Sequence, residues 1–214
     1  MRSAPPRKLG YVSYRGLILD FGGVVTTDFY GALSAFCIRE GLPPDAFVHV
    51  LRHTDRGRRA LAGVESGQIS QRAYEQVLGR LLGLDDQGLL GRALADLRPR
   101  AEVLDLVHHV RAAGIAAGVL SNSWGRGDYE PYQGYDLDGC FDAVVISDQV
   151  GLRKPDPAIY LLTAAKIGVP AAECVFVDDT AANLPVARDL DMATVHFTDS
   201  DAGVAEIERM LGIA

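Results

Sequence analysis

The chain has 214 residues, of which 48% are hydrophobic and 23% are charged, and these fractions exclude a disordered chain or a coiled coil. Its 21 basic and 28 acidic residues give a formal net charge of −7, the opposite of the basic excess typical of nucleic-acid binders. No run of about 18 apolar residues is present, so we expect no membrane-spanning segment.

Residues 1–15 are polar and include two prolines, so we expect an irregular leader there. This leader lacks the apolar stretch of a secretory signal peptide. The three cysteines, Cys37, Cys140 and Cys174, are widely spaced and form no CxxC pair, which favours reduced thiols in packed positions. We therefore expect a cytoplasmic protein without a disulfide framework.

Short apolar runs with the pattern of strands buried on both faces occur at residues 16–21, 115–120, 143–146, 174–177 and 193–197. Helical patterns occur between and after them, at residues 101–113, 157–167, 181–190 and 202–211. Strands that alternate with helices predict βαβ units, and hence an α/β fold with a parallel sheet and helices on both of its faces.

One stretch breaks this alternation. Residues 28–97 contain only helical patterns, at 29–40, 44–52, 58–64, 70–82 and 87–97. This helical segment after the first strand is too long for a single crossover connection. We therefore expect an inserted helical cap. The predicted division is a core of residues 16–27 and 98–214, a cap of residues 28–97 and the leader of residues 1–15.

Polar residues follow four of the predicted strands, at the edge where parallel sheets bind their ligands. They are Asp20, then Ser121 and Asn122, then Lys154, and finally Asp178 and Asp179. Taken singly, each has an ordinary explanation as a helix cap, a turn residue or solvated surface. Their occurrence in order after successive strands favours a functional site.

In the strings LILDFGGVV, VLSNS, GLRKPDP and VFVDDTAAN the chain resembles the haloacid dehalogenase superfamily, and specifically the members with a small helical cap (C1) after the first motif. The resemblance covers about residues 16–200 and implies a Rossmann-like core. It implies that Asp20 is a nucleophile, that Ser121 and Asn122 hold the transferred group, and that Lys154 neutralises the charge of the nucleophile and the phosphoryl group.

The same resemblance implies a metal site. Asp178 would bind Mg²⁺ directly together with Asp20 and the main-chain carbonyl of Gly22, and Asp179 would assist. Asn183 matches a family position that supports this acidic loop. The chemistry is consistent, because a carboxylate attacking an anionic phosphate ester needs cations nearby, and hard oxygen ligands suit Mg²⁺.

Gly22 departs from the usual family pattern. Family phosphatases usually carry a second aspartate there, which protonates the leaving oxygen. The dehalogenase branch typically has an aromatic residue at that position and no acidic pair in its last motif, so Asp178 and Asp179 favour a metal-dependent enzyme. Openings of the form Asp-x-Gly-Gly and Asp-x-Gly-Asn are similar to those of sugar-1-phosphate phosphatases and of the phosphatase domain of soluble epoxide hydrolases.

Two further features bear on the substrate. A basic cluster in the cap comprises Arg52, Arg56, Arg58 and Arg59, with His49 and His53 nearby, and it is either a lid that meets a second anionic group or a solvated helix face. The segment 123–139, which we call the aromatic loop, contains Trp124, Tyr129, Tyr132 and Tyr135. Three roles are open for this loop: it contacts the substrate, it forms part of a dimer interface, or its aromatic side chains only anchor the loop by packing.

We therefore predict a Mg²⁺-dependent phosphatase that acts on a small phosphorylated metabolite through an aspartyl-phosphate intermediate. Without an acid at Gly22, it is expected to favour sugar 1-phosphates or other activated esters. A weak or inactive binding or regulatory domain and a metal-free 2-haloacid dehalogenase are the alternatives. We expect a monomer or homodimer that binds neither nucleic acid nor membranes.

Overall fold

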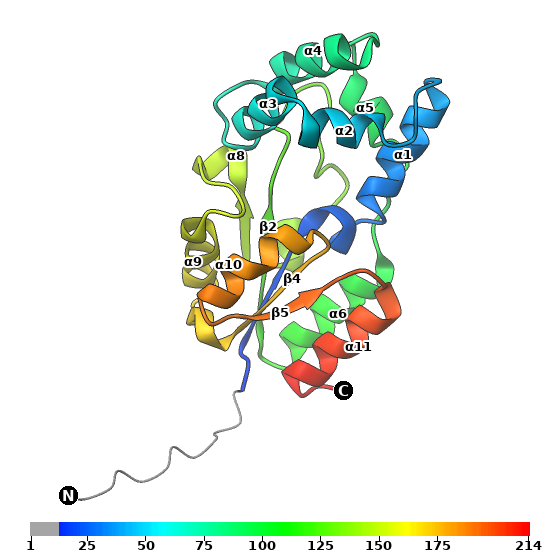
Figure 1. Cartoon of the computed structure of the whole chain (residues 1–214). Coiled ribbons are helices and arrows are strands. Elements are labelled where there is room, and N and C mark those ends of the chain that lie inside the picture. Colours follow the sequence, from blue (N-terminus) through cyan, green and yellow to red (C-terminus); the bar gives the residue numbers. More distant parts are fainter. Residues whose placement is uncertain (1–12) are drawn as a thin grey trace, which may run out of the picture.

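The computed structural model describes residues 13–214, so most of the leader expected at residues 1–15 lies outside the described residues. A five-stranded, fully parallel sheet forms the centre of the molecule (Figure 1). Its strands are β1 (Gly16–Leu19), β2 (Ala116–Ser121), β3 (Ala143–Ile146), β4 (Cys174–Asp178) and β5 (Ala193–His196). The order β3-β2-β1-β4-β5 places β1 at the centre, and it confirms the predicted α/β class.

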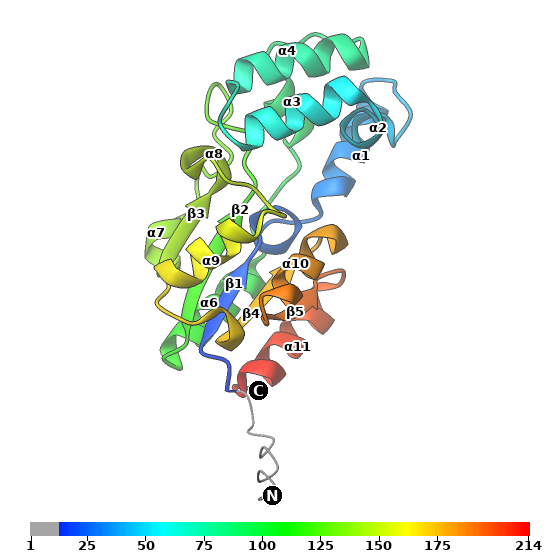
Figure 2. The ribbon, with the colours of Figure 1, turned by 60° about the vertical axis from the view of Figure 1, so that its left-hand side comes forward.

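Helices cover both faces of the sheet, as Figure 2 shows from a second direction. They are α6 (Ala101–Ala112) and α11 (Ser200–Leu211) on one face, and α9 (Pro157–Lys166) and α10 (Leu184–Asp189) on the other. Side chains alternate along β1: Leu17 and Leu19 pack with α6 and α11, whereas Ile18 packs with α9. This alternation is why a strand in such a sheet is apolar at every position.

The cap consists of five helices inserted between β1 and α6. They are α1 (Phe29–Arg39), α2 (Ala46–His53), α3 (Asp55–Glu65), α4 (Gln71–Leu82) and α5 (Leu89–Ala93). These helices bury a hydrophobic core of their own, in which Phe36, Phe47 and Tyr74 are almost fully buried. In Figure 1 the cap lies beyond the carboxyl ends of the strands.

The two chain segments that join cap and core run side by side. Thr26 and Pro99 form an antiparallel bridge. The Thr27 N–H donates to the Arg98 carbonyl at 2.8 Å, and the Arg100 N–H donates to the Val25 carbonyl at 2.9 Å. The cap is therefore attached to the core through one narrow, hydrogen-bonded ribbon.

Several elements differ from the sequence prediction. Two four-residue helices, α7 (Leu137–Cys140) and α8 (Ser147–Val150), and the turn η2 (Ala171–Glu173) are too short to show a helical period. The helix expected at 181–190 divides into a turn, η3 (Ala181–Asn183), and α10, which begins next to Pro185. The first strand ends at Leu19 because the chain turns at once into η1 (Phe21–Val25). No helix among residues 13–214 has the length and apolar character needed to cross a membrane.

Candidate active site

The first residue of the site, Asp20, directly follows the central strand β1. Its N–H donates to the Val177 carbonyl at 2.8 Å, which holds the residue beside the end of β4. Its carboxylate Oδ1 accepts from the Phe21 N–H at 2.7 Å and from the Lys154 ammonium at 2.6 Å. Both of these bonds use Oδ1, so Oδ2 makes no hydrogen bond within the described chain.

Lys154 joins two strand ends. Its Nζ lies 2.6 Å from Asp20 Oδ1 and 2.7 Å from Asp178 Oδ2, and the residue is only 2% exposed. Burial lowers the pKa of Lys154, but attraction to Asp178 and Asp20 outweighs burial and leaves that pKa raised. The side chain is therefore a fixed positive charge between two carboxylates.

Asn122 fixes the main chain of Lys154. Its Oδ1 accepts from the Lys154 N–H at 2.8 Å, and its Nδ2 donates to the Lys154 carbonyl at 3.1 Å. The resemblance implied that Ser121 and Asn122 both hold the transferred group. In the structure the Asn122 side chain is committed to Lys154, whereas the hydroxyl of Ser121 contacts Tyr132 at 2.9 Å.

The acidic loop after β4 holds Asp178 rigidly. Its carboxylate accepts from the Thr180 N–H at 2.8 Å and from Asn183 Nδ2 at 3.1 and 3.0 Å. Asn183 thus has the supporting contact that its position in DDxxxN predicted. The neighbouring Asp179 accepts from the Thr180 hydroxyl at 3.1 Å.

The two glycines after Asp20 have different roles. Gly23 has φ +82°, and a Cβ there would lie 2.2 Å from Asp179 Oδ2. Any other residue at position 23 would therefore clash with the Asp179 carboxylate. Gly22 has φ −71° and ψ 121°, which any residue adopts, and a Cβ there would lie 3.4 Å from the ring of Phe29. The backbone therefore requires glycine at position 23 but not at position 22.

The residues present fit a divalent cation. Asp20, Asp178 and Asp179 bring carboxylate oxygens within 4.8 Å of one another. Burial first, and then repulsion by Asp178, raise the pKa of Asp20 well above its ordinary value and that of Asp179 to about 6. Three carboxylates face one ammonium, so negative charge is in excess, and the oxygen-only donor set suits a hard ion such as Mg²⁺. The Gly22 carbonyl as a further ligand stays a prediction.

Two cap residues that the sequence analysis did not single out contact the loops that carry Asp179 and Lys154. Tyr30 of α1 hydrogen-bonds the Thr180 hydroxyl at 3.1 Å, beside Asp179. Glu65, at the end of α3, accepts from Arg153 Nε at 2.6 Å. Neither residue belongs to a spacing pattern, because both contacts arise when the cap packs on the core.

The basic cluster divides in the structure. Arg52 donates to the Tyr30 hydroxyl at 2.7 Å and is thereby connected to the acidic loop. Arg58 instead pairs with Asp55 on its own helix, and Arg59 donates to the Asp55 carbonyl at 3.3 Å. Of these three arginines, Arg52 is the one whose contacts lead toward the site.

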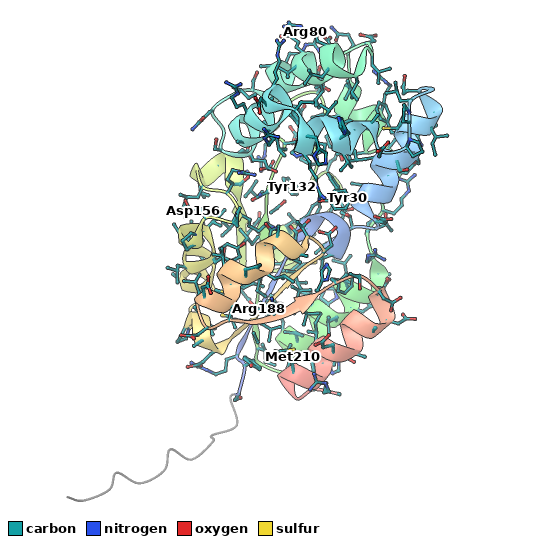
Figure 3. The ribbon with its side chains drawn as sticks, viewed as in Figure 1. Tyr30, Arg80, Tyr132, Asp156, Arg188 and Met210 are labelled. Atoms are coloured by element: carbon teal, nitrogen blue, oxygen red, sulfur yellow. The ribbon has the colours of Figure 1, made fainter. Side chains whose placement is uncertain are left out.

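The aromatic loop connects the core with the cap. Trp124 is 8% exposed and packs among cap residues, with its ring 5.9 Å from Phe47 and 5.6 Å from Tyr74. Gln71 of α4 donates to the Gly125 carbonyl at 3.0 Å. The start of the loop is therefore anchored by packing on the cap, while Figure 3 places Tyr132 between the cap helices and the sheet.

Residues 14–191 match the family model of the haloacid dehalogenase-like hydrolases. The chain belongs to this family. Such a hydrolase is expected to carry its reactive groups at the carboxyl edge of the sheet, where Asp20, Lys154 and Asp178 meet.

Named proteins similar to this haloacid dehalogenase-like hydrolase include two enzymes. The pig (Sus scrofa) bifunctional epoxide hydrolase 2 is 30% identical over 130 residues, which cover 58% of this chain but only 23% of the pig protein. The sesquiterpene phosphatase astK of Aspergillus oryzae is 29% identical over 154 residues, which cover 69% of this chain and 77% of that enzyme.

A solved structure extends the likeness to the fold of this hydrolase. A haloacid dehalogenase family enzyme of Bacteroides thetaiotaomicron, in complex with magnesium and inorganic phosphate, is 21% identical and superposes with a TM-score of 0.61. The match covers 85% of this chain and 93% of that chain. The likeness therefore extends over most of this chain.

Proposed function

We propose that this hydrolase is a Mg²⁺-dependent phosphatase that removes phosphate from a small phosphorylated metabolite. The observation that carries the proposal is the Lys154 ammonium, held 2.6 Å from Asp20 and 2.7 Å from Asp178. A phosphate monoester bears up to two negative charges, so a carboxylate attacks it only where positive charge offsets the repulsion. Lys154 supplies one such charge at a fixed place.

In the proposed reaction Asp20 Oδ2 attacks phosphorus while Oδ1 stays hydrogen-bonded to Lys154 and to the Phe21 N–H. The bond from phosphorus to Asp20 forms as the bond to the leaving oxygen breaks, and the departing alkoxide takes a proton from water. Water then attacks phosphorus, the bond from phosphorus to Asp20 breaks, and inorganic phosphate leaves while the Asp20 carboxylate is restored. The proton that this water loses neutralises the hydroxide left by the first step. Mg²⁺, when bound by Asp20, Asp178 and Asp179, supplies further positive charge for the phosphoryl oxygens.

Gly22 points to the class of substrate. No carboxylic acid stands at this position to protonate the leaving oxygen, although the backbone there accepts a side chain. General acid catalysis typically contributes about 10²–10⁴-fold, so substrates whose leaving group is a stable anion depend on it least. We therefore infer a preference for sugar 1-phosphates, acyl phosphates or aryl phosphates over esters of primary alcohols.

The relatives support this proposal. One of them is named a phosphatase, and a structure with the same fold was solved with magnesium and inorganic phosphate. The oxygen-only donor set of this chain is consistent with the same ion.

The deciding experiment is release of phosphate from 4-nitrophenyl phosphate, with and without Mg²⁺, by the wild type and by Asp20→Asn. We expect metal-dependent release that the substitution abolishes. The matched control is Asp156→Asn, because Asp156 caps α9 through the Ala158 N–H and asparagine caps equally well.

Two outcomes would contradict the proposal. Absence of release across a panel of sugar, acyl, aryl and nucleotide phosphates would favour a non-catalytic binding domain. Halide release from 2-haloacids that a chelator does not affect would favour the metal-free dehalogenase.

A further inference from the structure

One side chain of the aromatic loop reaches the site. The Tyr132 hydroxyl donates to Ser121 Oγ at 2.9 Å. The Tyr132 ring packs edge-on against Phe21, the neighbour of Asp20, with ring centres 4.8 Å apart. Figure 3 shows Tyr132 on the side of the core that faces the cap. The Tyr132 hydroxyl is thus bonded to one of the strand-end residues that the resemblance singled out.

In this hydrogen bond the Tyr132 hydroxyl is the donor and Ser121 Oγ is the acceptor. Since a hydroxyl has a single proton, the Tyr132 proton lies between the two oxygens and the Ser121 proton points elsewhere.

The Tyr132 hydroxyl keeps its proton over the pH range of an ordinary assay. Burial raises the pKa of Tyr132 to about 12. The Tyr132 proton therefore stays in place. Within residues 13–214 the Ser121 hydroxyl makes no other hydrogen bond, so its own proton is available to a ligand.

We propose that Tyr132 is a positioning residue that holds Ser121 as a hydrogen-bond donor toward the phosphoryl group on Asp20. The inference rests on the proposed phosphatase function. Phosphoryl oxygens only accept hydrogen bonds, so a serine that turned its proton toward Tyr132 would present lone pairs to them. Tyr132 excludes that orientation because its own proton already lies between the two oxygens.

The test compares Tyr132→Phe with Tyr135→Phe. Both rings pack edge-on against Phe21 at 4.8 Å, but only Tyr132 donates to Ser121. We measure the affinity for fluoroberyllate, a phosphoryl mimic, by fluorine NMR in the presence of Mg²⁺, and kcat and KM with 4-nitrophenyl phosphate. Tyr132→Phe is expected to weaken fluoroberyllate binding and to lower kcat roughly tenfold, the effect of one hydrogen bond to a charged group. Tyr135→Phe should change neither more than about twofold.

A second background separates positioning from general damage to the fold. If Tyr132 acts through Ser121, Tyr132→Phe has no further effect on kcat in a Ser121→Ala protein. Mg²⁺ affinity, measured by calorimetry, should stay the same in all variants. If Tyr132→Phe does not fold, Ser121→Ala alone should still weaken fluoroberyllate binding and lower kcat, and wild-type values in that variant would overturn the assignment.

Equal effects of Tyr132→Phe and Tyr135→Phe would overturn the assignment, as would a full effect of Tyr132→Phe in the Ser121→Ala background. Both results leave the phosphatase proposal standing. A wild-type protein that neither binds fluoroberyllate nor hydrolyses a phosphate ester would overturn the proposed function, and this assignment with it.

Discussion

Glu65 of the cap forms an ion pair with Arg153, the residue immediately before Lys154, at a distance of 2.6 Å. Glu65 is 6% exposed, whereas about a third of the Arg153 side chain is accessible. Asn122 Nδ2 also faces Glu65 Oε2, at 3.5 Å. The cap and the loop that carries Lys154 are therefore joined by a charge interaction beside the site.

Replacing Glu65 should destabilise the cap–core contact. Glu65→Ala leaves Arg153 without its partner, and we expect a loss of about 1–3 kcal/mol in the free energy of unfolding. Glu65→Gln keeps an oxygen that accepts from Arg153 and should cost less. Urea denaturation of the three proteins at pH 7 measures the difference, and equal stability of all three would mean that the ion pair does not hold the cap.

The same pair gives a pH dependence with a defined sign. Burial raises the pKa of Glu65 above its ordinary value of 4.5, and Arg153 opposes that rise only in part. Between the ordinary and the raised pKa the folded state binds more protons than the unfolded state, so the contribution of Glu65 to stability falls as pH rises through that window. The stability of the wild type relative to Glu65→Gln should therefore decrease on going from pH 4 to pH 7. A difference that does not vary with pH would contradict this.

Mg²⁺ affinity should depend on pH through Asp179. Burial and the charge of Asp178 raise the pKa of Asp179 to about 6, so below that pH protons compete with the metal for this carboxylate. We expect the affinity measured by calorimetry to fall as the pH drops through about 6, and Asp20, whose pKa is also raised, contributes to the fall. In Asp179→Asn the fall should shift to lower pH, and an unchanged profile in that variant would exclude Asp179 as its source.

The two adjacent glycines allow a matched comparison. Gly23→Ala adds a Cβ 2.2 Å from Asp179 Oδ2 at a residue with φ +82°, so we expect it to displace Asp179 and to lower Mg²⁺ affinity more than about tenfold. Gly22→Ala meets nothing closer than Phe29 at 3.4 Å, and it should fold with stability equal to the wild type or up to about 1 kcal/mol greater. Similar Mg²⁺ affinities in the two variants would show that Asp179 does not need this space.

Gly22→Asp tests the missing acid. The wild type should show a steep dependence of rate on the pKa of the leaving group, because the leaving oxygen carries the developing charge itself. In Gly22→Asp that dependence should become flatter, with turnover raised mainly on esters of primary alcohols. Gly22→Asn has nearly the same size without the acidic proton and is the control. A wild-type rate that is independent of the leaving group, in a step shown to be phosphoryl transfer, would refute the argument.

The sequence allows the fold and the central part of the site to be predicted for one physical reason. Parallel strands end at a common edge, so Asp20, Lys154 and Asp178 had to approach one another once their strands were recognised. The order of the strands and the hydrogen bonds that fix Lys154 needed the structure. The site roles that the resemblance implies for these residues stay predictions.

The contacts of Tyr30, Glu65 and Tyr132 lay outside what the sequence could show. Glu65 reaches Arg153 across 88 positions of sequence, and Tyr30 reaches Thr180 across 150. Such contacts depend on how the cap packs on the core, and no local period or spacing encodes that packing. Tyr132 was recognised as one of four aromatic residues in its loop, but nothing in the sequence distinguished it from Tyr129 or Tyr135.

The ribbon formed by Thr26 and Pro99 has a consequence for how this chain tolerates insertion and deletion. The chain leaves the core for the cap and returns to it at neighbouring residues. The two ends of the cap are therefore held together at the same place in the core, whatever length of chain lies between them. Loop-closure entropy grows only with the logarithm of that length, and doubling it costs about 0.6 kcal/mol. A change in the length of the cap therefore leaves the register of the five strands unchanged, as long as the cap keeps the surface that packs on Trp124 and binds Arg153.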